Sequence, residues 1–267
     1  MQTVLTIAGF DPSSGAGVTA DLMVFAAHGL FGTSAVTSLT VQSTTGVRSS
    51  EPVAAALLEA TLDCLHADLP PAGVKIGMLG TAPIAATVAA YLKRLRRLSP
   101  DVPVVLDPVV RSSSGRELLS PEGFGLLREG LLPLVTWVTP NLDELGLLTN
   151  LPAGNRNQIE TAAESLRDSF PELNILVTGG HRDPPDDLAL TAHGSPQWIA
   201  GTKVESRATH GTGCALSSAL LSRLVLGDTA LEAASAAKRY VAEAIRKAEP
   251  LGFGSGPLSL LWPLRQT

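Results

Sequence analysis

Short apolar runs alternate with longer stretches rich in Ala and Leu along most of this sequence. The runs are rich in β-branched residues, end at Gly, Asp or Pro, and are apolar on both faces, as in strands buried inside a parallel sheet. The longer stretches have the apolar spacing of helices. Strands are expected at 3–9, 34–42, 74–77, 102–107, 137–139 and 175–178, and helices at 16–29, 52–66, 81–97, 120–132, 143–149, 157–169, 213–226 and 229–248.

This alternation predicts an α/β fold of three layers, with a central, mostly parallel sheet and helices on both of its faces. In such folds, ligands bind at the carboxyl ends of the strands. Residues 188–201 depart from the alternation. Their turn sequence Gly-Ser-Pro at 194–196 predicts an antiparallel hairpin instead.

Two helix starts are marked by their chemistry. Ser120 is a cap residue that precedes Pro121, and proline fits the first helical position because its missing N–H costs nothing there. Thr229 and Glu232 have the spacing of a capping box. Both signals predict where a helix begins.

The chain has 267 residues, a formal net charge of −5, and 45% hydrophobic and 17% charged residues. This length permits one large core without a disulfide or metal, and there is no repeat or linker, so we expect a single domain over 1–267. The acidic balance argues against a surface that binds nucleic acid. A local site can still bind a small anion.

The two cysteines, Cys64 and Cys214, show no sign of forming a bridge, which is typical of a reducing compartment. The apolar run at 4–9 is too short to span a membrane and lacks the basic start of a secretory signal. We therefore expect a cytoplasmic protein with no membrane partner.

The strongest functional signal is Thr-His-Gly-Thr-Gly-Cys at 209–214, directly before an expected helix. Gly211 and Gly213 let backbone N–H groups converge at the helix N-terminus, and such a nest binds an anion or a phosphoryl group in transfer. Cys214 lies in the first turn, where the helix dipole is expected to lower its thiol pKa and make it a proton acceptor. The alternative is a simple turn with a small core cysteine.

The second signal is a glycine-rich loop at 9–17 between a strand and a helix. It lacks the Gly-Lys-Ser/Thr ending of a phosphate-binding loop, so it is expected to hold the substrate rather than ATP. Asp21, in the following helix, could accept hydrogen bonds from an amine or hydroxyl. The alternative for Asp21 is an acid that complements the helix dipole.

Together these motifs resemble the hydroxymethylpyrimidine and phosphomethylpyrimidine kinases of the ribokinase superfamily, and the likeness covers nearly the whole chain. The resemblance rests on several segments in the right order. They are Ala-Gly-x-Asp-Pro-Ser-x-Gly-Ala-Gly from residue 8, Lys-Ile-Gly-Met-Leu-Gly at 75–80, Asp-Pro-Val at 107–109, Thr-Pro-Asn-Leu-Asp-Glu at 139–144, Gly-Thr-Gly-Cys at 211–214 and Gly-x-Gly-x-Gly-Pro at 252–257.

The resemblance implies roles for single residues. The anion hole and catalytic base are implied to be Gly211, Thr212, Gly213 and Cys214. Asp107, Asn141 and Glu144 are implied to organise magnesium and its waters around the ATP phosphates. Carboxylates that leave room for water suit Mg²⁺, because this ion keeps several of its waters. The alternative for Asn141 and Glu144 is an ordinary helix cap and first-turn acid.

The pyrimidine pocket is implied to be lined by Gly9, Asp21, Gln42 and Met78. The amide of Gln42 offers a donor and an acceptor together, which complements an aminopyrimidine edge. Met78 would supply an adaptable apolar contact. The alternative for Gln42 is a polar strand end at the solvent boundary.

Four positions depart from the family pattern: Phe10 replaces a usual serine, and Met23, Ser113 and Thr178 each replace a usual lysine. Threonine followed by x-Gly is what many sugar kinases carry, so Thr178 and Gly180 are expected to bind ATP. The lost lysines remove positive charge that would hold a substrate already phosphorylated. Arg111 can compensate in part, but arginine and lysine are not interchangeable.

The expected reaction is transfer of the ATP γ-phosphoryl group to the hydroxymethyl oxygen of 4-amino-5-hydroxymethyl-2-methylpyrimidine, and then to its monophosphate, in thiamine biosynthesis. A homodimer is expected. One alternative is a pyridoxal or pyridoxine kinase on the same fold, against which Gln42 argues. The other is a non-catalytic regulatory relative, against which Asp107, Asn141, Glu144 and Cys214 argue.

Overall fold

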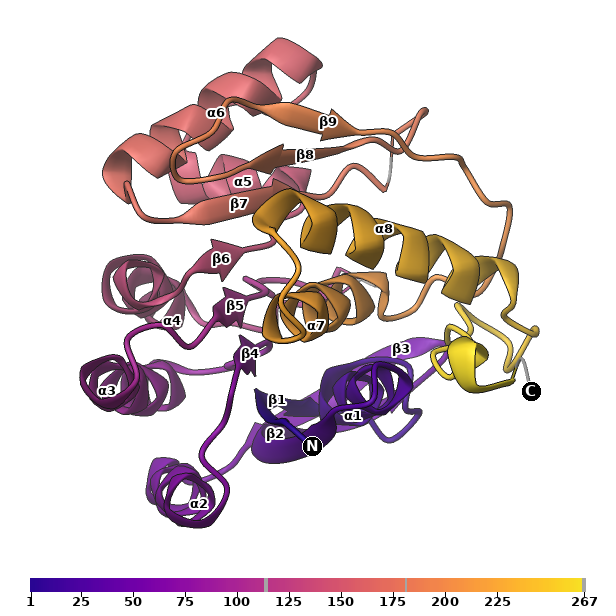
Figure 1. Ribbon diagram of the computed structural model, residues 1–267. Helices are drawn as coiled ribbons and strands as arrows, with labels where there is room; N and C mark the ends of the chain where they lie inside the picture. Colours follow the sequence, from indigo (N-terminus) through magenta and orange to yellow (C-terminus); the bar gives the residue numbers. More distant parts are fainter. Residues whose placement is uncertain (113–114, 181, 266–267) are drawn as a thin grey trace.

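The computed structural model describes residues 1–112, 115–180 and 182–265. In these ranges nine strands form one sheet in the order β3-β2-β1-β4-β5-β6-β7-β8-β9 (Figure 1). The strands are β1 Thr3–Phe10, β2 Phe31–Ser43, β3 Gly46–Pro52, β4 Val74–Ile76, β5 Val104–Leu106, β6 Trp137–Val138, β7 Asn174–Val177, β8 Asp187–Leu190 and β9 Gln197–Ile199.

The sheet is parallel at its centre and antiparallel at its edges. β2, β1, β4, β5, β6 and β7 pair in parallel, whereas β3 pairs antiparallel with β2, and β8 and β9 form an antiparallel hairpin after β7. The mostly parallel sheet and the hairpin at 188–201 are therefore confirmed.

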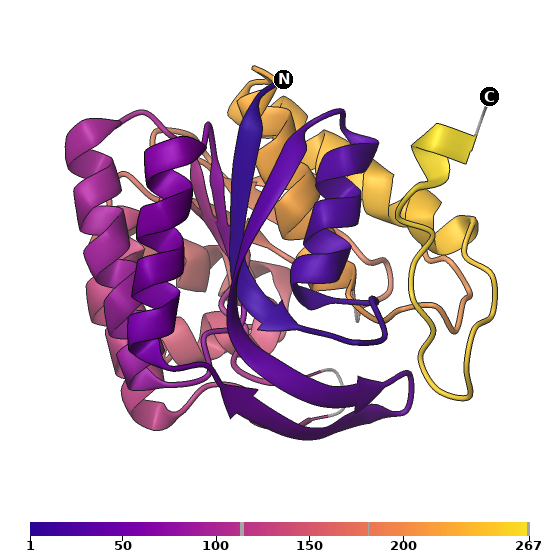
Figure 2. The same cartoon turned by 90° about the horizontal axis from the view of Figure 1, so that it is seen from below.

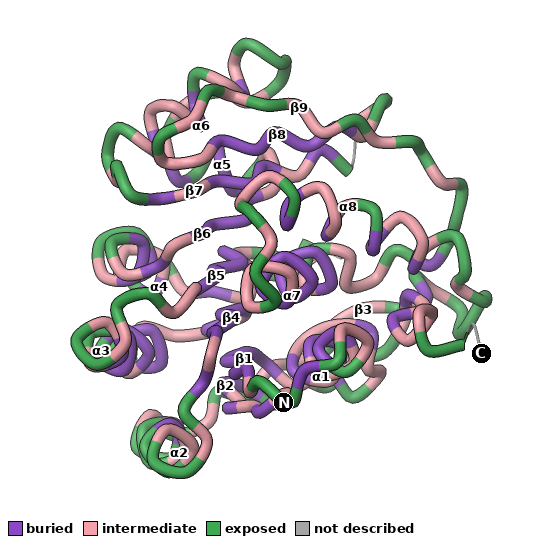
Figure 3. The backbone as a smooth tube through the Cα atoms, in the orientation of Figure 1, coloured by how far each residue is buried: buried purple, intermediate pink, exposed green. Residues whose placement is uncertain are grey.

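Helices cover both faces of the sheet (Figures 1 and 3). One buried cluster joins the sheet to α1, α7 and α8, and another joins it to α2, α3, α4, α5 and α6. This confirms the three layers. The helices are α1 Gly17–Ala27, α2 Ala55–Asp68, α3 Ala82–Leu98, α4 Pro121–Leu126, α5 Leu142–Thr149, α6 Arg156–Ser169, α7 Thr212–Val225 and α8 Ala230–Arg246.

The marked helix starts are confirmed. The Ser120 hydroxyl accepts a hydrogen bond from the backbone N–H of Gly123 at 3.1 Å, which caps α4. The carboxylate of Glu232 accepts one from the backbone N–H of Thr229 at 3.0 Å at the start of α8. The first contact satisfies a backbone N–H group that the start of a helix leaves unpaired. The second fixes the residue just before its helix.

Two expectations need correction. The helix expected at 120–132 ends at Leu126 and continues as a π turn, Leu127–Leu131, and a 3₁₀ turn, Leu132–Leu134, because Gly125 favours a helix weakly and Pro133 has no N–H to donate. β3 was not expected, because its sequence at 46–52 is polar and lacks an apolar alternation.

β2 and β3 extend past the end of the other strands (Figure 2). The tip of this hairpin meets the glycine-rich segment near the C-terminus, where a Cβ on Gly254 would lie 2.0 Å from the carbonyl oxygen of Thr44. The hairpin therefore closes one side of the edge where the central parallel strands end.

Candidate active site

Two glycine-containing loops are pressed together at the carboxyl edge of the sheet. Gly211 has φ +82°, and a Cβ on it would lie 1.8 Å from the carbonyl oxygen of Gly15. A Cβ on Gly15 would in turn lie 2.2 Å from Cδ2 of His210. Neither position has room for a side chain, so these contacts bring the substrate loop expected at 9–17 against the anion loop at 209–214.

The second loop leads directly into α7. Gly211 is the N-cap, and Thr212 and Gly213 are the first helical residues, so their N–H groups belong to the end of the helix that has no internal partners. Gly213 is exposed, and Asp107 Oδ2 lies 3.6 Å from the position of a Cβ there. The arrangement places a helix N-terminus, the kind of helix end that can bind an anion, beside a carboxylate.

Cys214 does not have the lowered pKa that the helix dipole predicted. The thiol is half-buried, and burial raises its pKa to about 12, against the opposing effect of Lys75 and with the added effect of the Asp107 and Asp21 charges. A hydrogen bond from the backbone N–H of Gly17 favours the thiolate but does not outweigh burial. The expectation of an acidic cysteine was wrong, and at neutral pH the thiol holds its proton.

Asp21 lies beneath the site rather than in it. Its carboxylate is fully buried and pairs with Lys75 Nζ at 2.9 Å. It also accepts hydrogen bonds from the hydroxyls of Thr6, at 2.6 Å, and Ser218, at 2.8 Å. The oxygens of Asp21 are thus used within the core, and Asp21 lies beyond the first turn of α1, which contains no acidic residue.

Lys75 is the cation under the site, and it too is fully buried. Burial alone would lower its pKa, but the charges of Asp21, Cys214 and Asp107 outweigh burial and raise the pKa above the usual value. Lys75 therefore stays positive below the anion loop. The sequence carries a signal for this role, because Lys75 is a lone charged residue between Val74 and Ile76 in an otherwise apolar strand.

Asp107, Asn141 and Glu144 follow β5 and β6 at the same edge. Asn141 and Glu144 form a capping box at the start of α5, with Glu144 N–H to Asn141 Oδ1 and Asn141 N–H to Glu144 Oε2 both at 2.9 Å. The helix-cap alternative is therefore confirmed for this pair. It leaves the second carboxylate oxygen of Glu144 with one long hydrogen bond, 3.4 Å, from the N–H of Val110.

Among the described residues, Lys75 offsets the charge of Asp107, whereas Glu144 faces the negative charge of Asp107. Burial raises the pKa of Asp107 to about 6, despite the opposing charge of Lys75. Burial and the negative charge of Asp107 raise the pKa of Glu144 to about 8. Within the described ranges no three His, Cys, Asp or Glu side chains gather as a metal cage. Mg²⁺ keeps several waters and takes one or two carboxylates beside phosphate oxygens, so the neighbouring carboxylates of Asp107 and Glu144 fit this ion.

Thr178 lies next to the metal-site candidates, since its N–H donates to the carbonyl oxygen of Pro140 at 2.9 Å and it bridges to Asn141. Gly180 is exposed, two residues further along. The intervening Gly179 is tied to Asp187, whose carboxylate accepts from the Gly179 N–H at 2.8 Å and pairs with Lys238. His181 lies outside the described residues.

Gly9 lies in β1, Gln42 lies in β2, and Met78 follows β4. A Cβ on Gly9 would lie 3.0 Å from Sδ of Met78, so these two are in contact. Gln42 is half-buried, and its amide lies 3.0 Å from Nε2 of His210. The structure brings Gln42 to the anion loop through His210, a residue not expected at the site although it belongs to the motif at 209–214.

The structure shows the surroundings of several positions that depart from the family pattern or bear on it. Met23 packs against the apolar cluster under α1, α7 and α8. Arg111 is solvent-exposed and pairs with Glu117 at 3.8 Å. Ser113 lies outside the described residues.

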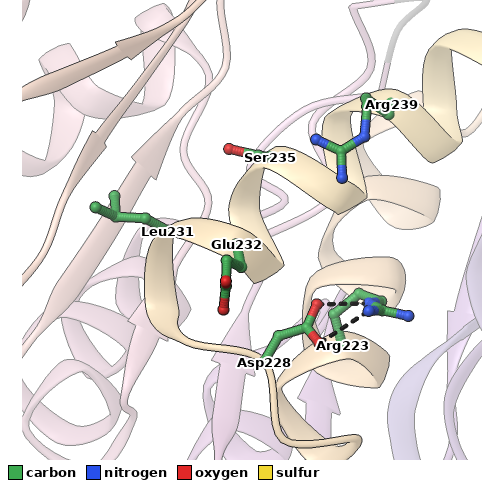
Figure 4. Close-up of a pocket in the computed structure, with 6 residues that line it drawn as sticks. All are labelled: Arg223, Asp228, Leu231, Glu232, Ser235 and Arg239. Carbon is green, nitrogen blue, oxygen red and sulfur yellow. Dashed lines mark hydrogen bonds and ion pairs between the residues drawn. The ribbon is translucent and has the colours of Figure 1, made fainter.

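A separate cavity lies at the far end of α7 (Figure 4). Arg223 pairs there with Asp228 at 2.7 Å. The cavity is near the C-terminus of a 14-residue helix that begins at the anion loop, so about 20 Å of helix separates it from the site. Its lining residues are Arg223, Asp228, Leu231, Glu232, Ser235 and Arg239.

Comparison with known proteins identifies the family. The sequence profile described as Phosphomethylpyrimidine kinase matches residues 11–259, and so includes most of the loop at 9–17, the loop at 209–214 and the carboxylates between them. This chain belongs to the phosphomethylpyrimidine kinase family. A hydroxymethylpyrimidine/phosphomethylpyrimidine kinase of Synechococcus elongatus is 39% identical over 270 residues, which cover 97% of each chain.

Solved structures agree with this membership of the phosphomethylpyrimidine kinase family. The crystal structure of a phosphomethylpyrimidine kinase from Clostridium difficile 630 has 33% identity and a TM-score of 0.79, and the match covers 92% of this chain and all of that chain. The pyridoxal kinase of Staphylococcus aureus in complex with AMP-PCP has 28% identity and a TM-score of 0.89 over 100% of this chain and 96% of that one. The fold is thus the ribokinase-like fold of these kinases.

Proposed function

We propose that this chain transfers the γ-phosphoryl group of ATP to the hydroxymethyl oxygen of 4-amino-5-hydroxymethyl-2-methylpyrimidine, and then to the monophosphate, in thiamine biosynthesis. One observation carries the proposal. The helix end formed by Gly211, Thr212 and Gly213 lies beside the carboxylate of Asp107 and against the loop that holds Gly9 and Gly15. An acceptor alcohol and an anionic phosphoryl group can therefore be held at one place.

The chain's contribution to the chemistry is positioning and charge. The N–H groups at the start of α7 stabilise the charge that develops on the phosphoryl oxygens, and Lys75 adds a fixed positive charge beneath them. Asp107 and Glu144, with Asn141, would hold Mg²⁺, which would supply positive charge to the phosphate oxygens. Thr178 and Gly180 would bind the nucleotide.

Cys214 is our candidate for the group that accepts the hydroxyl proton. With a pKa raised to about 12, its thiolate is a small fraction of the molecules at neutral pH but a strong base. A loose phosphoryl transition state requires little early deprotonation of the attacking oxygen, so the hydroxyl proton can pass late in the step to the sulfur of this thiolate fraction, which carries no proton of its own.

The ring substrate distinguishes this proposal from the pyridoxal kinase alternative. The Staphylococcus aureus structural relative acts on pyridoxal by name, at 28% identity, whereas relatives named for the pyrimidine reach 39%. The Gln42 amide lies beside the anion loop, 3.0 Å from Nε2 of His210, which supports an aminopyrimidine. We also propose that the lost lysines make the monophosphate the poorer substrate.

Further proposals concern the setting of the enzyme. A homodimer is supported by Leu39 and Val41, which are 56% and 57% exposed on β2, and sedimentation would test it. A single domain over 1–267 is supported by the one continuous sheet. No helix of the described ranges has both the length and the apolar character to cross a bilayer. Location in the cytoplasm and independence from nucleic acids and membranes stay predictions.

A coupled kinase assay with the pyrimidine alcohol, its monophosphate and pyridoxal side by side tests the function. We expect the highest kcat/KM for the alcohol, a lower value for the monophosphate that falls further at high ionic strength, and the lowest value for pyridoxal. A preference for pyridoxal would favour the alternative kinase. No turnover of any of the three would favour a non-catalytic relative.

A further inference from the structure

Asp11, His210 and Gln42 form a row of contacts between three distant segments of the chain. His210 Nε2 lies 2.7 Å from Asp11 Oδ2 and 3.0 Å from the amide of Gln42. We propose that Asp11 and His210 are positioning residues that hold the Gln42 amide in the one orientation with which it reads the substrate ring. This inference rests on the proposed function, because it assigns the ring to Gln42.

The first step is the state of Asp11. The residue is 3% exposed, and its carboxylate accepts hydrogen bonds from the N–H of Ser13 at 2.8 Å, the hydroxyl of Ser13 at 2.7 Å and the N–H of Ala16 at 3.0 Å. Burial raises the pKa of Asp11, but the hydrogen bonds from His210 and Ser13 outweigh it, so the pKa is lowered. Asp11 is a carboxylate and only accepts, so the nitrogen Nε2 of His210 must carry a hydrogen.

The second step is the orientation of Gln42 toward His210. The structure puts Gln42 Nε2 3.0 Å from His210 Nε2, where two N–H donors would face each other. A half-turn of the amide exchanges two atoms of nearly equal size and turns Oε1 toward His210. The Nε2–H of His210 then serves both Asp11 and Gln42.

The third step comes from an independent neighbour, Thr40. Its hydroxyl lies 2.9 Å from the carbonyl oxygen of Phe10, which can only accept, so the single hydroxyl hydrogen points there. Thr40 Oγ1 can then only accept from Gln42, whose other amide atom lies 3.3 Å away. That atom must be the nitrogen, which is the same half-turn that His210 requires.

Two contacts with no shared atom on Gln42 thus agree on one amide orientation. Each end of the amide keeps unused capacity, one N–H on the nitrogen and one lone pair on the oxygen. An amino group next to a ring nitrogen offers the complementary acceptor and donor. A ring without that adjacent pair gains at most one of the two hydrogen bonds.

The test is a double-mutant cycle on KM for the ring substrate. We expect His210→Ala to raise KM for the pyrimidine alcohol about tenfold, the loss of one polar contact, with KM for ATP changed less than twofold. In a Gln42→Met background the same substitution should add almost nothing, because the amide it holds is gone. His210→Gln should recover most of the affinity, since its NH₂ group can donate to both Asp11 and Gln42.

His28→Ala is the matched control. His28 is also half-buried and bonds the backbone, Nδ1 to the carbonyl oxygen of Val24 at 2.8 Å, but at the end of α1 away from the carboxyl edge. It should lower thermal stability without changing KM for the ring. If His210→Ala does not fold, Thr40→Val releases the other end of the amide, and the same coupling to Gln42→Met is expected.

The outcomes separate the inference from the proposed function. Losses from His210→Ala and Gln42→Met that multiply in the double variant, or an equal rise of KM for ATP, would overturn the positioning role. A parent enzyme that phosphorylates pyridoxal but not the pyrimidine overturns the proposed function instead. The cycle is then measured with pyridoxal, where independent losses again count against His210.

Discussion

The surroundings of Cys214 reverse the pKa shift that its position at the start of a helix predicts. A position in the first turn of α7 favours thiolate, but the loss of water around the sulfur and the carboxylates of Asp107 and Asp21 oppose it more strongly. Lys75 moderates this effect. The residue is therefore expected to be a slow nucleophile and a strong base, rather than a reactive thiolate.

The first prediction follows from the raised pKa of Cys214. Its alkylation by iodoacetamide should rise about tenfold per pH unit from pH 7 to pH 9 without a plateau, because the thiolate fraction grows throughout that range. Mass spectrometry of the peptide in a Cys64→Ser variant measures the rate. A plateau below pH 8 would mean that the thiol is acidic after all.

For the same residue, Cys214→Ser should lower kcat by roughly 10²–10⁴ while ATP binding is kept, the usual range for a lost proton acceptor. Single-turnover rates and nucleotide titration measure the two quantities separately. Unchanged turnover would return Cys214 to the role of a packing residue.

The second prediction concerns Glu144 and Mg²⁺. Because the folded pKa is raised from 4.5 to about 8, the folded protein holds a proton there between those values, and Mg²⁺ must displace it. The rise in melting temperature on adding Mg²⁺ should therefore be larger at pH 8.5 than at pH 6. Glu144→Gln should weaken the rise and flatten its pH dependence.

Glu129→Gln serves as the control, since Glu129 is exposed and belongs to the π turn after α4. It should leave both the Mg²⁺ effect and its pH dependence as in the parent. An effect of Mg²⁺ that is greater at low pH would contradict the assignment of the carboxylate pair.

At the scale of elements, the site depends on how the start of α7 meets the loop after β1. The left-handed conformation of Gly211 and its contact with Gly15 hold the helix N-terminus against this loop. The strand ends supply the rest: Asp107 follows β5, and Thr178 follows β7. The geometry of the site thus depends on how the ends of these helices and strands pack against each other.

The third prediction tests that packing with two glycine substitutions. Gly211→Ala needs φ +82° and meets a carbonyl oxygen at 1.8 Å, so we expect a loss of at least about 1–3 kcal/mol of stability and most of kcat. Gly125→Ala is the matched control, because Gly125 lies in α4 with nothing within 4 Å of a Cβ. It should stabilise the protein by about 0.5–1 kcal/mol. Thermal unfolding and initial rates measure both, and equal effects would contradict the argument.

At the scale of the whole molecule, the Lys75–Asp21 pair joins β4 to α1 inside the core. Hydroxyls from β1 and α7, on Thr6 and Ser218, complete the shell around the carboxylate. A buried charge keeps its place only while its partner is present. This cluster therefore ties the central strands to the helices that carry both loops.

The fourth prediction is that Lys75→Met and Asp21→Asn each cost about 3–5 kcal/mol in urea unfolding, because each leaves a buried group unpaired. The double variant should cost less than the sum. Arg94→Met is the control: its pair with Asp63 is about half-exposed, and the loss should be below about 1 kcal/mol. Additive losses at Lys75 and Asp21 would show that the pair is not coupled.

The sequence predicted the layered fold, the hairpin at 188–201, the helix starts at Ser120 and Thr229, and a helix directly after the Gly-Thr-Gly motif. These features depend on spacing and on residues within a few positions of each other, which a sequence displays directly. The sequence did not predict β3, because this strand is polar and is specified by its pairing with β2 rather than by its own pattern.

Which groups meet depends on the tertiary structure. Asp21 pairs with a lysine 54 residues away, and Gln42 meets a histidine 168 residues away. The raised pKa of Cys214 also comes from burial and from charges on other strands and helices. Hydrogen bonds and Coulomb interactions act through space over a few ångströms, and only the completed fold sets those distances.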